Sequence, residues 1–214
     1  MCYPPKIKIM KTIIQSSLKS ALSYSAYKEL MQKLISENSN TGEWSEERMG
    51  FTKLNFSRMK RMDAKVEISP EATSLFNKID QKQYWLVLLE SWCGDGAQTI
   101  PVLNKLAENS ENIELKILLR DENPEMMELF LTNGSKSIPK LIIVDENLEL
   151  LNTWGPRSQA AAKMVTDYKN EHGRVDATIK TQLQIWYNQD KGRNIISELV
   201  ESETKICERL TPNF

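Results

Sequence analysis

Cys93 is the residue with the clearest chemical potential in this chain of 214 amino acids. It lies in the segment Trp92-Cys93-Gly94-Asp95, directly after an apolar run, where a buried strand should end and a helix should begin. The first turn of a helix offers free backbone N–H groups and the positive end of the helix dipole, and both stabilise a thiolate. A carboxylate at Asp95 would oppose that effect, so the sequence leaves the direction of the net pKa shift open.

Two interpretations of Cys93 follow from its surroundings. In the first it is a nucleophile whose thiolate is stabilised by the backbone amides of Gly94 and Asp95. In the second it only packs, because a free cysteine often behaves as a small apolar residue. Gly96 stands where a dithiol redox motif has its second cysteine. A mixed disulfide on Cys93 would therefore have to be released by a low-molecular-weight thiol or by Cys207.

A second segment, Ser137-Ile138-Pro139-Lys140, leads into another apolar run. Its composition is typical of a turn that enters a buried strand. Taken together, the two segments predict a thiol that faces a proline.

The bulk properties of the chain argue against several classes of protein. Its 28 lysines and arginines are balanced by 29 aspartates and glutamates, which gives no net field toward nucleic acid or an anionic membrane. No apolar stretch approaches the roughly 20 residues that span a bilayer. Three widely spaced cysteines and a single histidine predict neither a disulfide framework nor a metal site. We expect a cytoplasmic protein without nucleic-acid or membrane partners.

The elements that position these residues can be read from apolar spacing and turn signals. Strands are expected at 84–89, 113–119, 141–144 and 148–151. Helices are expected at 17–35, 45–62, from Pro70, at 94–108, 124–131 and 157–170, and twice within 177–206. The segment from Met1 to Ile9 shows no helical period, so Met10 is an alternative start and Cys2 receives little weight. A strand–helix–strand crossover followed by a hairpin predicts a mixed sheet.

In their order along the chain, these motifs resemble the thioredoxin family. The resemblance covers about Gln83 to Asn170 and rests on Trp92-Cys93-Gly94, Pro101, the turn 121–124 and Ile138-Pro139. The whole chain also resembles a single-cysteine group of that family from Bacteroidetes-type bacteria. The marks of that group are the segments 52–55, 92–95, 120–124 and 154–157.

The resemblance implies an α/β, thioredoxin-like fold in which helices flank a four-stranded mixed sheet. Residues 81–172 would form the core, 1–80 an N-terminal helical extension, and 173–214 C-terminal helices that pack on the core. Two positions depart from the family, because Val87 and Ile117 replace the buried acid and lysine that assist proton transfer in thioredoxin.

The resemblance also implies roles for single residues. Cys93 would be the attacking thiol, and Trp92 would shield it. Pro139 would be a cis-proline, and the backbone of Ile138 would pair with an extended substrate. The leading hypothesis is a single-cysteine redox protein that acts on protein or peptide thiols and disulfides, with no cofactor beyond a small thiol as reductant. The alternative is a non-catalytic thioredoxin-fold protein-binding module whose groove recognises an extended protein segment, and the sequence leaves open whether the chain is an enzyme.

Other polar candidates carry less weight. Arg120 and Arg157 could bind a carboxylate, but ion pairs with Asp121 and Asp95 are the favoured interpretation. A basic stretch is favoured as a solvated helix face rather than a nucleic-acid surface; its members are Lys53, Arg58, Lys60 and Arg61. We expect His172 at the surface.

Overall fold

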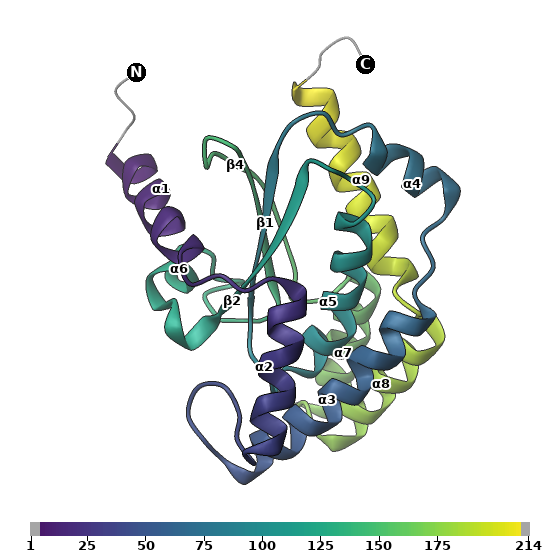
Figure 1. Ribbon diagram of the computed structural model, residues 1–214. Coiled ribbons are helices and arrows are strands. Elements are labelled where there is room, and N and C mark those ends of the chain that lie inside the picture. Colours follow the sequence, from purple (N-terminus) through teal and green to yellow (C-terminus); the bar gives the residue numbers. More distant parts are fainter. Residues whose placement is uncertain (1–4, 211–214) are drawn as a thin grey trace.

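The computed structural model describes residues 5–210 and is built around a single four-stranded sheet that is flanked by helices (Figure 1). The strands lie in the order β2-β1-β3-β4. Their bounds are Gln83–Leu89 for β1, Ile113–Leu119 for β2, Lys140–Asp145 for β3 and Leu150–Trp154 for β4. Strand β1 pairs with β2 in parallel and with β3 antiparallel, and β3 pairs antiparallel with β4. This arrangement confirms the predicted mixed sheet and fold class.

Strand β1 is central because its side chains are apolar on both faces. The side chains from Trp85 to Leu89 are buried, and neighbouring strands satisfy the backbone on both sides. An uninterrupted apolar run is the pattern of a strand that is covered on both faces. Its last residue, Leu89, lies four residues before Cys93.

The helices α1 to α9 surround this sheet (Figure 1). Their bounds are Pro5–Leu18, Tyr24–Ser36, Glu46–Lys65, Pro70–Asn77, Gly94–Ala107, Pro124–Leu129, Gln159–His172, Ala177–Asp190 and Arg193–Leu210, in chain order. The side-chain oxygens of Ser23, Ser45 and Ser69 each accept a hydrogen bond from the backbone N–H three residues later. This capping fixes where α2, α3 and α4 begin. None of the helices within 5–210 is long and apolar enough to cross a membrane.

The prediction of one helix over 17–35 is wrong. The chain leaves α1 at Leu18 and restarts as α2 at Tyr24. Between the two helices Leu22 forms both backbone hydrogen bonds with Ile117 of β2, each of 2.8 Å. The apolar spacing continues through the break, and only this pairing with a distant strand interrupts the helix.

The start of the chain also differs from expectation. Helix α1 begins at Pro5, within a segment for which the sequence indicated no helix. Cys2 lies outside the described residues. The other elements agree with the predictions to within a few residues at their ends, and β2 has the predicted bounds.

One continuous core runs through the three predicted segments of the chain. It contains Ile14, Tyr27 and Met59 from the N-terminal helices, the sheet, and Leu199 from α9. Helix α3 packs against α5, and α8 packs against α7 around a small apolar cluster that includes Tyr187. These packings place α3 and α8 near α5, the helix that begins after Cys93.

Candidate functional site

Cys93 lies between β1 and α5 and caps the helix with its own side chain. Its Sγ accepts a hydrogen bond from the N–H of Gly96 at 3.3 Å, and its carbonyl accepts from Ala97 at 3.1 Å. A thiol sulfur takes the place of the oxygen that a serine or aspartate usually supplies at this position. The predicted strand–helix junction is therefore confirmed, and it presents the sulfur to unpaired amides.

The Ile138–Pro139 segment lies beside this sulfur, just before strand β3, which neighbours β1. The Sγ of Cys93 donates a hydrogen bond to the carbonyl of Ile138 at 3.4 Å, and the Ile138–Pro139 peptide bond is cis. Because that segment enters β3, which pairs with β1, the two sequence motifs lie together at one end of the sheet. The structure thus brings together the thiol and the proline that the sequence singled out.

The thiol of Cys93 is poorly disposed to ionise. Only 7% of the residue is exposed, and this burial raises the pKa of Cys93 to about 12, with a further rise from the carboxylate of Asp95. The N–H of Gly96 and the guanidinium of Arg157 act in the opposite direction but do not outweigh burial. The thiolate is the nucleophile in thiol exchange. The burial of Cys93 therefore favours the thiol over the thiolate in this conformation.

Asp95 is buried in an ion pair next to the thiol. Its Oδ2 lies 2.6 Å from Nη2 of Arg157, and its Oδ1 accepts a hydrogen bond from the Tyr187 hydroxyl at 3.1 Å. Burial raises the pKa of Asp95, and the contacts with Arg157 and Tyr187 limit that rise. The predicted pairing of Arg157 with Asp95 is confirmed, as is that of Arg120 with Asp121 at 2.8 Å.

Trp92 is held in place by three residues. Its indole N–H donates to the carbonyl of Thr41 at 3.1 Å. The guanidinium carbons of Arg48 and Arg120 lie 4.7 and 5.1 Å from the ring centroid, at cation–π distances. No local pattern of residues indicates a role for Arg48 or Thr41, because both contacts depend on how the N-terminal segment folds back onto the core.

Ser91 ties the loop before Cys93 to helix α3. Its hydroxyl lies 2.8 Å from the hydroxyl of Thr52 and accepts from the backbone N–H of Thr41 at 3.0 Å. Its carbonyl accepts from the side-chain amide of Asn55 at 3.0 Å. Thr52 and Asn55 belong to the segment 52–55, so this network accounts for two of that segment's four residues. Their role is to hold the loop that carries Cys93.

The position of the missing second cysteine is closed by packing. A Cβ atom at Gly96 would lie 2.0 Å from Cδ1 of Leu89, at the end of β1, and 3.4 Å from Sγ of Cys93. Heavy atoms do not approach so closely, so any side chain at Gly96 would require Leu89 to move. The core around Gly96 is thus packed for a residue without a side chain, in agreement with the absence of a second cysteine.

A pocket of about 700 Å³ opens beside Cys93. It is formed by α3, the first residues of α5, the Ile138 segment, Arg157 and helix α8. Its lining residues are Glu47, Arg48, Phe51, Arg58, Trp92, Cys93, Gly94, Asp95, Ile138, Arg157, Ala177, Lys180, Thr181, Leu183 and Gln184. The sequence identified the central residues, but it missed the contribution of α3 and α8.

Cys207 does not reach this site. It lies on α9, where the negative charge of Glu203 contributes to its raised pKa, and Glu203 accepts a hydrogen bond from Gln83 at the start of β1. Cys93 follows the end of the same strand. Seven residues of strand span roughly 20 Å, so the two sulfurs lie at opposite ends of β1. Cys207 is not placed to release a mixed disulfide on Cys93.

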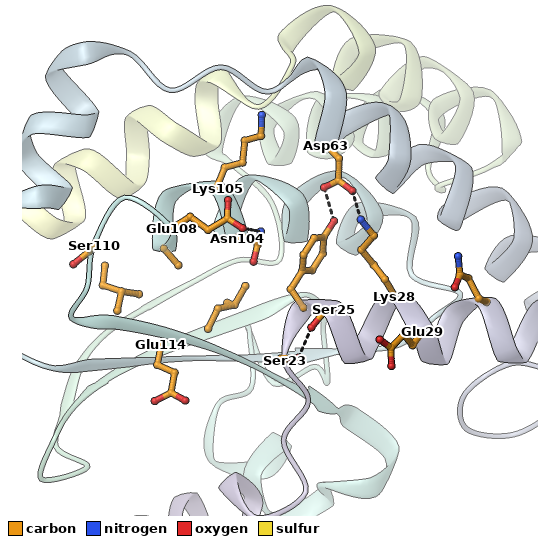
Figure 2. Close-up of a pocket in the computed structure, with 15 residues that line it drawn as sticks. Ser23, Ser25, Lys28, Glu29, Asp63, Asn104, Lys105, Glu108, Ser110 and Glu114 are labelled. Carbon is orange, nitrogen blue, oxygen red and sulfur yellow. Dashed lines mark hydrogen bonds and ion pairs between the residues drawn. The ribbon is translucent and has the colours of Figure 1, made fainter.

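Within 5–210, no group of His, Cys, Asp and Glu side chains could hold a metal ion. A larger pocket of about 830 Å³ lies between α2, α3, α5 and β2 (Figure 2). There Lys28 reaches Asp63 at 2.8 Å, so its central charges are already paired. This pocket includes the C-terminal end of α5, whereas Cys93 lies at the N-terminal end of that helix.

Comparison with solved structures shows the fold. The chain is similar to a protein of unknown function from Pseudomonas aeruginosa, with a TM-score of 0.55 and 17% identity over 85% of this chain and 96% of that chain. It is also similar to an HIV epitope-scaffold, with a TM-score of 0.53 and 18% identity over 85% and 97%. No curated protein matches the chain significantly.

The family assignment comes from the sequence comparison. A family model described as thioredoxin matches residues 41–169, which is more than half of the chain. The matched residues include the whole sheet, the Cys93 junction and the Ile138–Pro139 segment. The chain belongs to the thioredoxin family.

Proposed function

We propose that this protein is a non-catalytic binding module that holds a ligand in the pocket beside Cys93. The sequence favoured a redox role, and the geometry supports the alternative more strongly. The observation that carries the proposal is the packing at Gly96, where Leu89 fills the space that a second cysteine would need. With glycine at this position the motif has no second thiol for a dithiol cycle, and burial favours the protonated form of the thiol that remains.

The thioredoxin fold supports a binding role for the end of the sheet at which Cys93 lies. The Ile138 segment and Cys93 meet at one end of the sheet, and α3 and α8 add walls to the pocket around them. Function in a common fold has to be argued from its site, and this site is a concave pocket with both apolar and charged lining. Trp92 is fixed by its neighbours, which favours a preformed surface.

The test compares the wild-type protein with Cys93→Ser. Each protein is incubated with a cell extract under non-reducing conditions, washed, and examined by native mass spectrometry. We expect both proteins to retain the same species, with no mass released by dithiothreitol. A species that is found only on the wild-type protein, and that is removed by dithiothreitol, would contradict the proposal and establish covalent trapping.

A second candidate is monothiol exchange, and the hydrogen bond from Gly96 to Sγ favours it. The thiolate of Cys93 would attack a disulfide and form a mixed disulfide, releasing one thiolate. A small thiol would then attack that mixed disulfide, restoring Cys93 and forming a new disulfide. Membership of a single-cysteine group within the family and a substrate-docking role for Pro139 belong to this candidate and stay predictions.

The pH dependence of alkylation tests this second candidate. Labelling at Cys93 is followed by mass spectrometry, with Cys93→Ser to account for other cysteines. An apparent pKa well below about 8.5 with fast labelling would support a working nucleophile. Slow labelling with a raised pKa is what the burial of Cys93 predicts. This result would exclude monothiol exchange and would favour the binding module.

A further inference from the structure

The pocket beside Cys93 carries an excess of positive charge, although the chain as a whole has a net charge of −1. Four cationic side chains line it against two acidic ones, Glu47 and Asp95. The cations are Arg48, Arg58, Arg157 and Lys180. They come from α3, from the segment before α7 and from α8, so the folded structure gathers them from distant parts of the sequence.

Two of these cations lack an acidic partner. Asp95 is engaged with Arg157, and Arg48 lies 4.0 Å from the carboxylate of Glu43. Across residues 5–210, neither Arg58 nor Lys180 takes part in an ion pair. Burial and the nearby charge of Arg61 lower the pKa of Arg58, and the negative charge of Asp95 acts in the opposite direction.

Hydrogen-bond donors converge where α5 begins. A Cβ atom on Gly94 would lie 3.3 Å from Nη1 of Arg58 and 3.6 Å from Nε2 of Gln184, so both nitrogens lie over the first residue of the helix. In addition, the buried Nε of Arg157 has no acceptor among the described residues. The positive end of the α5 dipole acts in the same direction. Nη1 of Arg58 also donates to Oδ1 of Asn55 at 2.9 Å, so a negatively charged acceptor here would add a contact to that guanidinium and supply the acceptor that Nε of Arg157 lacks.

The lining also includes large apolar side chains. They belong to Phe51, Trp92, Ile138 and Leu183, and the pocket volume of about 700 Å³ lies within the usual range for small-molecule sites. An occupant that suits the whole pocket therefore combines an acidic group with an apolar or aromatic part. A neutral molecule would leave Arg58 and Lys180 without a counter-charge.

We propose that this pocket binds a small organic anion, whose carboxylate or phosphate contacts Arg58, Arg157 and Lys180 while its apolar part packs against Trp92 and Phe51. This inference rests on the proposed function, in which the pocket holds a ligand. It adds the chemical class of that ligand. It also assigns recognition to α3 and α8, the two helices that contribute residues to the lining of the pocket around the start of α5.

The test uses two fluorescent probes of similar shape. One is 8-anilinonaphthalene-1-sulfonate, which carries an anionic group, and the other is N-phenyl-1-naphthylamine, which is neutral. Both are titrated against the wild-type protein, the double variant Arg58→Gln/Lys180→Gln, and the control Lys53→Gln/Lys169→Gln. The control removes the same charge from exposed residues outside the pocket. Cys93→Ser is titrated in parallel, and circular dichroism verifies that each variant is folded.

We expect the anionic probe to bind the wild-type protein with one-to-one stoichiometry and more tightly than the neutral probe. The Arg58/Lys180 variant should lose about tenfold or more in affinity for the anionic probe alone, because it loses charge-assisted contacts. The control should bind as the wild type does. Displacement of the probe by phenyl phosphate or by phenylacetate would identify the acidic group that the pocket takes.

Equal binding of the two probes would overturn the anion assignment, as would an unchanged affinity in the Arg58/Lys180 variant. Displacement by neither competitor would also overturn it. These results are distinct from failure of the proposed function, which would appear as a dithiothreitol-sensitive species retained by the wild-type protein and not by Cys93→Ser, or as no binding of either probe to the wild-type protein. The charge preference and the dependence on the thiol are therefore measured separately.

Discussion

The carboxylate of Asp95, two residues after Cys93 along the chain, lies 2.6 Å from the guanidinium of Arg157. The pair has opposite effects on that thiol, because Asp95 raises the pKa of Cys93 and Arg157 lowers it. Asp95 is buried, and Arg157 is partly exposed in the pocket. The chemistry of the thiol is thus set by an ion pair that a ligand in the pocket would touch.

The substitution Asp95→Asn tests this relationship. Removing the negative charge should lower the pKa of Cys93, because Arg157 would then stabilise the thiolate unopposed. Alkylation of Cys93 at pH 8 should accelerate roughly tenfold for each unit by which the pKa falls. The rate is measured by mass spectrometry. The control Asp167→Asn removes an exposed aspartate of α7, and its rate should not change. An unchanged rate in Asp95→Asn would show that burial alone suppresses the thiolate.

The packing between Gly96 and Leu89 predicts a stability difference between two glycine substitutions. Gly96→Ala should destabilise the fold by about 1–3 kcal/mol, because its Cβ overlaps Cδ1 of Leu89. Gly50→Ala is the matched control, since Gly50 lies within α3 and has no atom within 4 Å of its Cβ position. That change should stabilise the fold by about 0.5–1 kcal/mol. Urea denaturation measures both, and equal effects would contradict the packing argument.

The network around Ser91 predicts a cost for a near-isosteric change in α3. Thr52→Val removes the hydroxyl that lies 2.8 Å from Ser91 in a buried position. The free energy of unfolding should fall by about 1–3 kcal/mol, because a buried polar group loses a partner. Thr204→Val, at an exposed position of α9, is the control and should change stability by less than about 0.5 kcal/mol. A similar effect in both variants would exclude a special role for Thr52.

Glu203 predicts a pH dependence of stability. The residue is fully buried, its Oε2 accepts from Gln83 at 3.0 Å, and its Oε1 has no partner among the described residues. Burial raises the pKa of Glu203 to about 7. The folded state therefore favours the protonated acid, so this contribution to stability is complete below the unfolded pKa and declines as the pH rises to about 7.

The variant Glu203→Gln should remove that decline. Its gain in stability over the wild type should be larger at pH 8 than at pH 5, by on the order of 2–3 kcal/mol. Urea denaturation at several pH values measures the difference. Glu201→Gln, which removes an exposed carboxylate of the same helix, should follow the wild-type profile. If the stability of Glu203→Gln declined with pH as that of the wild type does, the titration of another group would cause the decline.

The sequence alone determined the elements that depend on local patterns. The continuous apolar run at 84–89 predicted β1, the apolar residues of 113–119 predicted β2, and Ser69 followed by Pro70 marked where α4 begins. The site of Cys93 at the end of a strand followed from the same local signals. These predictions succeeded because apolar spacing, capping and turn residues act within a few positions along the chain.

The tertiary structure alone decided the break between α1 and α2, the high pKa of Cys93 and the charged pocket. The break requires Leu22 to pair with Ile117, and the pocket requires Arg58 and Lys180 to meet at the start of α5. Burial, ion pairing and cavity shape arise when segments far apart in sequence pack together. Their effects on charge and hydrogen bonding depend on distances in space, which no local pattern of residues contains.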